Sequence, residues 1–308
     1  MATLPHMSRS INESMAPNRP SLADTRMIMN LVLQSPKPAT VAMERVAALV
    51  GAKRHVMLGE AAMRCEDVPC NDALKAEIAT AALAAGIDAS FIPAGLRLQD
   101  FGLLAMDMDS TLITIECIDE IADMQGLKPQ VAAITEAAMR GEIEFRESLA
   151  RRVALLKGLE ASALERVYRE RLQLSPGAEP MLDAVRQAGL KTLLVSGGFT
   201  YFTDRMQTRL ALDFTHSNAL DVEEGKLTGK LLGDIVDADE KKATVERVCA
   251  RMGMLPRQAI VVGDGANDLK MMGIAGLSVA FRAKPVVQAQ ADVALNFCGL
   301  DGILTLFE

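Results

Sequence analysis

The stretch LLAMDMDSTL, Leu103–Leu112, joins an apolar run to two aspartates, Asp107 and Asp109, that lie one residue apart. Runs of this kind fill buried strands, and here the charges come where such a strand would end. In an open parallel sheet, ligands bind outside the carboxyl ends of the strands. The stretch therefore predicts a core strand that delivers two carboxylates to a binding crevice.

Three later segments repeat this pattern, and helical segments separate them. They are LKTLLVSGGF (190–199), QAIVVGDGAND (258–268) and GLSVAF (276–281). Continuous apolar strands that alternate with helices favour a parallel sheet covered on both faces. The fold class predicted is α/β, a Rossmann-like parallel sheet with helices on both faces, over a domain at 99–308.

A helical insert interrupts this domain at about 113–180. Its apolar residues recur at spacings of three and four, which is typical of amphipathic helices, and Gly and Pro residues mark the helix ends. An insert directly after the first crevice corner would cover that corner as a lid. Further on, the alternating stretch 219–233 predicts a hairpin around Glu224 and Gly225.

The chain before residue 99 divides into two parts. Residues 1–24 are polar and aperiodic with Pro and Ser, which predicts a flexible tail. Residues 25–98 alternate strand and helix patterns, with one strand expected over 55–63, and predict a small α+β domain.

The composition excludes several classes of protein. Of the 308 residues, 50% are hydrophobic and 24% are charged, as in ordinary globular proteins. No apolar run approaches the roughly 18 residues that cross a bilayer, and no signal-peptide core is present, so we expect a cytoplasmic protein without a membrane partner. A net charge of −7 without Trp or a basic run argues against nucleic-acid binding. Five scattered cysteines without CxxC spacing favour free thiols.

Clustered carboxylates need a counter-charge, because burying uncompensated ions costs several kcal/mol each. A hard divalent cation such as Mg²⁺ meets this need, and we expect its ligands to be the carboxylates of Asp107 and Asp264 and the backbone carbonyl of Asp109. One aspartate can act as a nucleophile that forms an aspartyl-phosphate. Since alternate residues of an extended strand point the same way, Asp107 would attack while Asp109 moves the proton.

The other two corners supply groups for a phosphate. Ser196 and the glycines at 197 and 198 offer a hydroxyl and free N–H groups to an oxyanion, and the two glycines of GDGAND allow the backbone to approach a ligand. Each corner taken alone is equally consistent with a simple turn or a solvated strand end. Their combination at three strand ends favours one catalytic crevice.

These motifs together resemble the haloacid dehalogenase superfamily: DMDST (107–111), the Ser196 corner, GDGAND (263–268), and Lys241, chosen over Lys242 as the expected lysine. The stretches ECIDEIA, VSGGFT and NALDVEEGKLTGKLLGDIVDADEKK are similar to those of the phosphoserine phosphatases within it. The resemblance covers about 101–308. It implies a helical cap over the sheet and a Mg²⁺ cofactor.

The resemblance also implies roles for individual residues. Asp107 would be the nucleophile and Asp109 the proton donor, with Thr111 supporting that corner. The phosphate would be held by Ser196, Gly197, Lys241 and Asn267, and Asp268 would orient metal-bound water or the lysine. In the cap, Glu116 would meet the substrate ammonium and Arg152 its carboxylate, beside an apolar wall of Met139 and Phe145. Without the resemblance, each cap residue would be interpreted as a solvated helix residue or as core.

The activity implied is Mg²⁺-dependent hydrolysis of O-phospho-L-serine through an aspartyl-phosphate, the final step of serine biosynthesis. Three alternatives stay open: a phosphatase or phosphotransferase for another small ester such as phosphohomoserine, a glycosyltransferase that uses DMD for a metal nucleotide, and a non-catalytic amino-acid sensor. The domain at 25–98 resembles ACT-type regulatory domains, which implies an amino-acid effector and a homodimer. A folded spacer or dimerisation module is the alternative interpretation.

Overall fold

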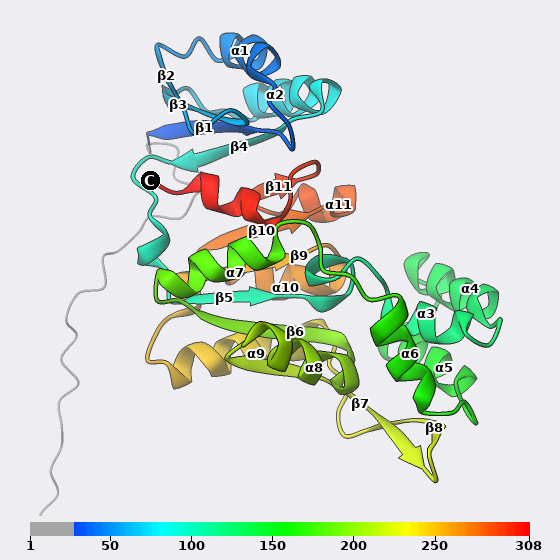
Figure 1. The fold of residues 1–308 in the computed structure, drawn as a ribbon. Helices are drawn as coiled ribbons and strands as arrows, with labels where there is room; N and C mark the ends of the chain where they lie inside the picture. The colour runs from blue at the N-terminus through cyan, green and yellow to red at the C-terminus, as the bar shows by residue number, and fades with distance from the viewer. Residues whose placement is uncertain (1–27) are drawn as a thin grey trace, which may run out of the picture.

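The structure is a computed structural model that describes residues 28–308, and the tail expected at 1–24 lies outside the described residues. Two sheets organise these residues (Figure 1). The larger sheet has seven strands in the order β11-β10-β9-β5-β6-β7-β8. Their bounds are β5 (Leu103–Met106), β6 (Lys191–Phe199), β7 (Phe214–Glu223), β8 (Lys226–Leu232), β9 (Ala259–Gly263), β10 (Leu277–Phe281) and β11 (Val293–Leu295).

The predicted parallel sheet is confirmed, since β5 pairs in parallel with both β6 and β9. Successive residues of β5 are buried in opposite layers: Leu104 and Met106 pack into one core, and Leu103 and Ala105 into the other. The strand is apolar throughout because both of its faces are covered. On the first side lie α7 (Ala178–Gln187) and α8 (Thr200–Leu210), and on the second α9 (Ala238–Arg251), α10 (Leu269–Met272) and α11 (Pro285–Gln288).

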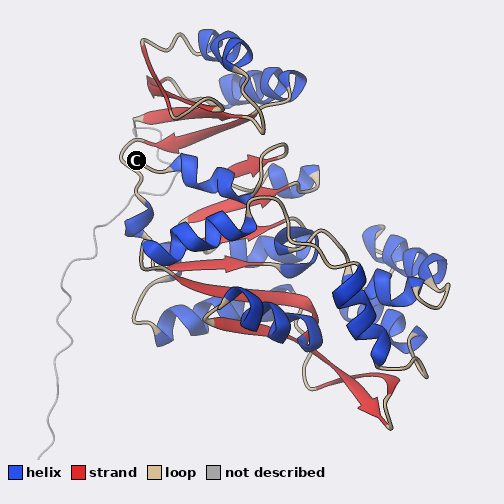
Figure 2. Cartoon of the chain, in the orientation of Figure 1, coloured by secondary structure: helices blue, strands red, loops and turns tan. Residues whose placement is uncertain are grey.

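The insert between β5 and α7 forms a separate layer of four helices, which we call the cap (Figure 2). They are α3 (Cys117–Asp123), α4 (Lys128–Met139), α5 (Phe145–Leu155) and α6 (Ser162–Glu170). The cap lies beyond the carboxyl ends of β5 and β6 (Figure 1). The segments that enter and leave the cap lie side by side, where Thr114 N donates to Gln173 O at 3.0 Å and Ser175 N to Leu112 O at 3.0 Å. We call this pair of segments the hinge.

The hairpin expected at 219–233 is present as the antiparallel pair β7 and β8. The structure adds that β7 begins earlier and that its first part pairs in parallel with β6. The hairpin also bonds to the cap, because Gly158 N donates to Leu227 O at 2.7 Å and Ala161 N to Gly225 O at 2.8 Å. The cap is therefore held by backbone hydrogen bonds at the hinge and at this hairpin.

The smaller, N-terminal sheet is antiparallel, with the order β2-β3-β1-β4, and two helices accompany it. The single strand expected over 55–63 is wrong. The chain turns at Gly59, whose φ of +113° suits glycine, and the segment forms two strands instead of one. The elements are β1 (Met29–Gln34), α1 (Thr40–Leu49), β2 (Arg54–Met57), β3 (Ala62–Val68), α2 (Asp72–Ala85) and β4 (Asp88–Pro93).

The N-terminal sheet is joined to the core by a buried carboxylate. Asp88, at the start of β4, is 2% exposed and accepts three backbone N–H groups just after β11. The donors are Asn296 at 2.7 Å, Phe297 at 3.1 Å and Cys298 at 2.9 Å. The terminal 3₁₀ segment η5 (Leu300–Leu306) and the residues after it add to this junction, because Arg64 donates to Phe307 O at 2.6 Å.

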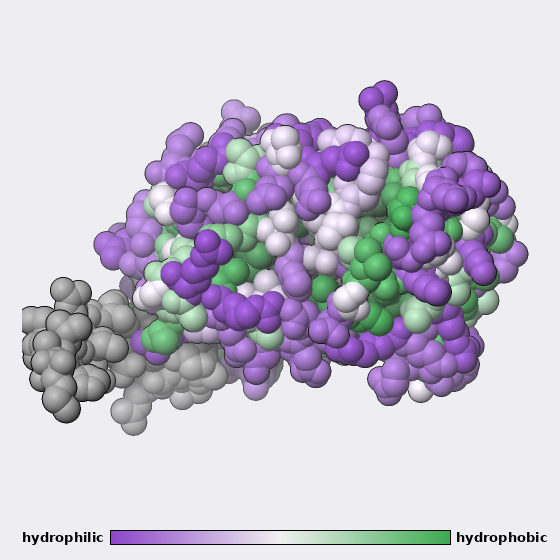
Figure 3. All heavy atoms as spheres, turned by 90° about the horizontal axis from the view of Figure 1, so that it is seen from below, coloured by the Kyte–Doolittle hydropathy of each residue, from purple (hydrophilic) through white to green (hydrophobic). Residues whose placement is uncertain are grey.

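The surface is largely polar. On the face shown in Figure 3, hydrophilic residues surround smaller apolar patches. Across residues 28–308, no helix combines the length and the apolar character that a bilayer crossing requires.

Candidate active site

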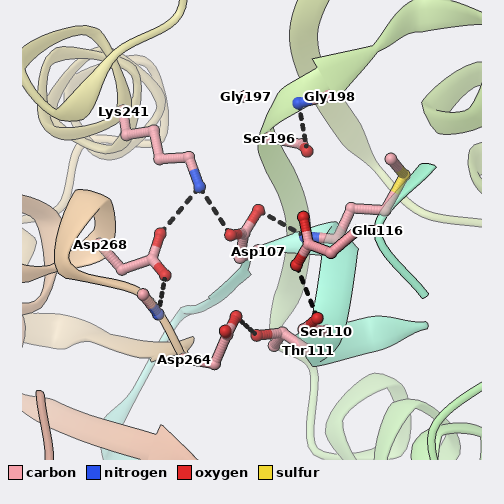
Figure 4. A network of polar contacts seen from close by, with 12 residues as sticks. Asp107, Ser110, Thr111, Glu116, Ser196, Gly197, Gly198, Lys241, Asp264 and Asp268 are labelled. Atoms are coloured by element: carbon pink, nitrogen blue, oxygen red, sulfur yellow. Dashed lines mark hydrogen bonds and ion pairs between the residues drawn. The ribbon is translucent and has the colours of Figure 1, made fainter. Parts of the chain in front are cut away.

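Asp107 lies directly after β5 and anchors the site (Figure 4). Its side chain is nearly buried; Oδ1 accepts Met108 N at 2.7 Å, and Oδ2 lies 2.9 Å from Nζ of Lys241. A short helical turn, η2 (Met108–Leu112), follows, and Ser110 within it takes a positive φ of 54°. The strand ends at Met106, but Asp109 itself has an extended backbone, with φ of −64° and ψ of 136°. That both aspartates face the substrate stays a prediction.

The Asp109 carboxylate lies between the cap and the β6 corner. Oδ1 accepts the backbone N–H of Cys117 at 3.4 Å. Oδ2 lies only 2.8 Å from where a Cβ on Gly198 would stand, so residue 198 must lack a side chain. Burial first, and the charge of Glu116 second, hold the pKa of Asp109 well above its usual range. A carboxyl with a raised pKa is suited to act as a general acid.

Lys241 joins two strand ends from the first turn of α9. Its fully buried ammonium lies 2.9 Å from Asp107 and 2.8 Å from Asp268. Burial alone would lower the pKa of Lys241, but the two carboxylates outweigh it and the pKa is raised. Asp268 also accepts Gly265 N at 3.0 Å. Its carboxylate therefore binds both the backbone of the GDGAND turn and Lys241.

Three carboxylates come together as a group that could hold a cation: the ligand atoms of Asp107, Asp264 and Asp268 lie within 4.8 Å of one another. Burial, then Asp107 and Asp268, raise the pKa of Asp264 to about 7, against a weaker lowering by the Thr111 hydroxyl, which donates to Oδ1 at 2.9 Å. Lys241 alone does not balance the three carboxylates, so the cluster keeps a surplus of negative charge. Its all-oxygen donor set and surplus charge fit a hard divalent cation.

The β6 corner presents the groups expected for an oxyanion. Ser196 Oγ accepts Gly198 N at 2.9 Å, and α8 begins two residues later, at Thr200. Asn267 folds its amide over Gly265, where its oxygen would lie 2.1 Å from an added Cβ. Glycine is therefore favoured at positions 198 and 265 because neighbouring groups come too close for a side chain, and not because the backbone takes a positive φ.

The cap brings two opposite charges to this crevice. Glu116 precedes α3, accepts Ser110 Oγ at 2.6 Å, and has a pKa raised mainly by burial. Arg152 lies on α5, and burial lowers its pKa against the attraction of Asp119, Glu116 and Asp109. Among residues 28–308, no carboxylate lies within ion-pair distance of Arg152. A partly buried guanidinium without an ion pair is suited to an external carboxylate.

The apolar wall is present in part. The Phe145 ring edge lies 3.3 Å from where a Cβ on Gly197 would stand, so α5 touches the β6 corner. Met139 is the last residue of α4, and its side chain lies outside what the structure describes.

Two residues of the site were not anticipated. Ser110 is part of the DMDST motif, but no role was expected for it. Its hydroxyl donates to the carboxylate of Glu116. Asn218 is buried on β7, where it donates to Gly197 O at 2.8 Å and accepts Val236 N at 2.8 Å. A lone amide within an otherwise alternating hairpin sequence was the available signal for Asn218.

Comparison with known proteins agrees with this geometry. The family model of haloacid dehalogenase-like hydrolases matches residues 101–276. A phosphoserine phosphatase from Polaromonas sp. is 57% identical over 218 residues, which are 69% of this chain and 92% of that protein.

Two solved structures extend the comparison. A haloacid dehalogenase-family hydrolase from Salmonella enterica superposes with a TM-score of 0.82 at 32% identity, covering 91% of this chain and 99% of that one. A substrate-bound phosphoserine phosphatase complex superposes with a TM-score of 0.64 at 36% identity, covering 68% and 99%. The first likeness includes the N-terminal sheet as well as the core.

Proposed function

The chain belongs to the phosphoserine phosphatases of the haloacid dehalogenase-like hydrolase family, and from this membership we propose that it hydrolyses O-phospho-L-serine to L-serine and phosphate. The observation that carries the proposal is the pair of opposite charges that the cap adds to the phosphate crevice. Glu116 matches a substrate ammonium, and the unpaired guanidinium of Arg152 matches a substrate carboxylate. A phosphate ester without these groups would leave both charges without a partner on the substrate.

Asp107 is the nucleophile in this proposal. Its carboxylate oxygen attacks phosphorus, and the bond from phosphorus to the serine oxygen breaks to leave an aspartyl-phosphate. Asp109 supplies the proton that the leaving oxygen needs, which its raised pKa supports. The same carboxylate then takes a proton from water, the water oxygen attacks phosphorus, and the bond to Asp107 breaks to release phosphate.

The remaining residues bind and orient the phosphoryl group. Ser196 Oγ, the backbone of Gly197 and the Asn267 amide would donate to the phosphoryl oxygens, and Lys241 would oppose their negative charge. Phe145 lies against Gly197 and helps to exclude bulk water, so that a single positioned water meets the intermediate.

We propose that Asp107, Asp264 and the backbone carbonyl of Asp109 hold Mg²⁺, with Asp268 supporting from behind through Lys241. A bound Mg²⁺ supplies positive charge that polarises the phosphoryl oxygens and cancels carboxylate repulsion. The group of close carboxylates supports a cation here. The oxygen-only donor set favours a hard divalent cation, and Mg²⁺ is the one that we propose.

Phosphate release by the purified protein tests the function directly. We expect release from O-phospho-L-serine when Mg²⁺ is present and none after chelation. A panel with phosphohomoserine and other small esters should rank phosphoserine first by kcat/KM. Release from every ester at a similar rate would contradict the proposed role of the cap. No release from any ester would contradict the proposal that the protein is a phosphatase.

The other expectations stay predictions. They are a cytoplasmic location, a place as the last step of serine biosynthesis, a homodimer, and an amino-acid effector at the N-terminal sheet. Equilibrium ultracentrifugation tests the dimer, and calorimetric titration with L-serine tests the effector.

A further inference from the structure

An ion pair links α5 of the cap to the start of α9 in the core. Nε of Arg146, on α5, lies 2.6 Å from Oδ2 of Asp237. The Arg146 side chain is 57% exposed, whereas that of Asp237 is 15% exposed. The two residues are 91 positions apart, so the pair forms only when the cap lies against the core.

Both partners stand next to residues of the active site. Arg146 follows Phe145, whose ring lies over Gly197. Asp237 is the N-cap of α9: Oδ1 accepts Glu240 N at 3.0 Å, and its carbonyl accepts the backbone N–H of Lys241 at 2.9 Å. The ion pair thus ties the cap residue that covers the phosphate corner to the helix turn that carries the buried lysine.

The pair is weak compared with the other attachments of the cap. The hinge and the β7–β8 hairpin hold the cap by backbone hydrogen bonds, including Thr114 N to Gln173 O and Gly158 N to Leu227 O. An exposed ion pair contributes little, since solvent screens it and a long side chain must be ordered. It is therefore the contact that can break and re-form while the hinge and hairpin stay intact.

We propose that Arg146 is a positioning residue that latches the cap closed over the bound phosphate through Asp237. The latch adds to substrate retention, because it holds α5 where Phe145 lies against Gly197. It does not touch the reacting atoms, so it acts on binding and release rather than on the chemical steps.

The latch rests on the proposed function only for the choice of ester in the kinetic test. The first test therefore uses inorganic phosphate with Mg²⁺, which does not need turnover. By calorimetry, Arg146→Ala should weaken phosphate binding about two- to fivefold, the range of an exposed ion pair. Arg151→Ala is the matched control, because Arg151 is on the same helix, is 55% exposed and, within residues 28–308, forms its ion pair with Glu147 of that helix. Equal affinities for both variants would overturn the latch.

The second test separates a latch from a structural role. Asp237→Asn removes the charge but keeps a good N-cap, so α9 stays capped. In a double-mutant cycle, the phosphate affinity of Arg146→Ala with Asp237→Asn should be no weaker than that of either single variant. Additive losses would mean that the two residues act independently and would overturn the proposal.

Kinetics with phosphoserine gives a third readout. For Arg146→Ala we expect KM to rise by the same factor as the phosphate dissociation constant, with kcat unchanged or higher because the cap opens more easily for product release. A fall in kcat at constant KM would contradict the latch. Failure of the wild-type protein to hydrolyse phosphoserine would instead contradict the proposed function and leave the phosphate-binding result to decide the latch.

Discussion

Lys241 Nζ lies 2.9 Å from Asp107 Oδ2, and the two side chains are 1% and 7% exposed. The ammonium also lies 2.8 Å from Asp268, so one cation serves two carboxylates in a buried site. Removing one member of such a group leaves the others buried without compensation, and this costs far more than the loss of a surface ion pair.

Lys241→Met is expected to lower the free energy of unfolding by about 3–5 kcal/mol and to abolish turnover. Lys242→Met is the control, since the Lys242 side chain is 40% exposed and pairs with Glu246 in the same helix; we expect a change of about 0.5 kcal/mol or less. Urea unfolding of both variants measures the difference. Similar losses would show that burial of Lys241 is not what the site depends on.

Asp107→Asn should reduce kcat by on the order of 10³-fold or more, because an amide oxygen does not replace the carboxylate nucleophile. In the wild-type protein, acid quenching during turnover should trap one phosphoryl group on the peptide that contains Asp107, measured by mass spectrometry. The variant should trap none. Substantial turnover by Asp107→Asn would exclude the covalent route.

Arg152→Ala should cost about 1.5–3 kcal/mol in kcat/KM for phosphoserine, or roughly 10- to 150-fold, because a charge-assisted contact to the substrate carboxylate is lost. Phosphoethanolamine keeps the ammonium and the phosphate but lacks that carboxylate. Its kcat/KM should change little in the same variant. Equal losses on the two esters would mean that Arg152 does not recognise the carboxylate.

Metal binding should depend on pH through Asp264, whose pKa in the metal-free protein is raised to about 7. A proton on this carboxylate competes with the cation, so Mg²⁺ affinity should rise about tenfold per pH unit up to about pH 7 and then level off. Calorimetric titrations with Mg²⁺ across this range measure it. Affinity that is flat from pH 5 to pH 8 would contradict the assignment.

The same shift has a consequence for stability. The folded protein binds the Asp264 proton more tightly than the unfolded chain does, so this group stabilises the metal-free fold at low pH. That contribution is complete below the unfolded pKa of about 4 and is lost as the pH rises through about 7. Asp264→Asn should remove this part of the pH dependence in thermal unfolding without metal.

Asp88→Ala should detach the N-terminal sheet from the core. Three backbone N–H groups would lose their acceptor in a buried junction, which we expect to cost about 3 kcal/mol or more. Asp72→Ala, at an exposed first-turn position of α2, should cost about 1 kcal/mol or less. An earlier unfolding transition in Asp88→Ala alone, followed by calorimetry, would show that the junction rather than the sheet has weakened.

Much of the site could be predicted because its residues come at strand ends. Asp107, Ser196 and Asp264 each follow an apolar run, and the topology of a parallel sheet brings such ends to one edge. The helical insert follows from the periodicity of its apolar residues, whereas the order of the strands was not predicted and comes from the structure. The strand at 55–63 was wrong because one glycine turn within an apolar stretch does not change its overall pattern.

The sequence by itself determined the α/β class, the cap and the residues that carry charge to the crevice, since these depend on local periodicity and on chemistry at strand ends. Only the tertiary structure decided which of those charges meet. Lys241 between Asp107 and Asp268, Asn218 between Gly197 and Val236, and Arg146 against Asp237 all join residues far apart in the chain. No local pattern encodes such contacts, because they depend on how separately formed helices and strands pack.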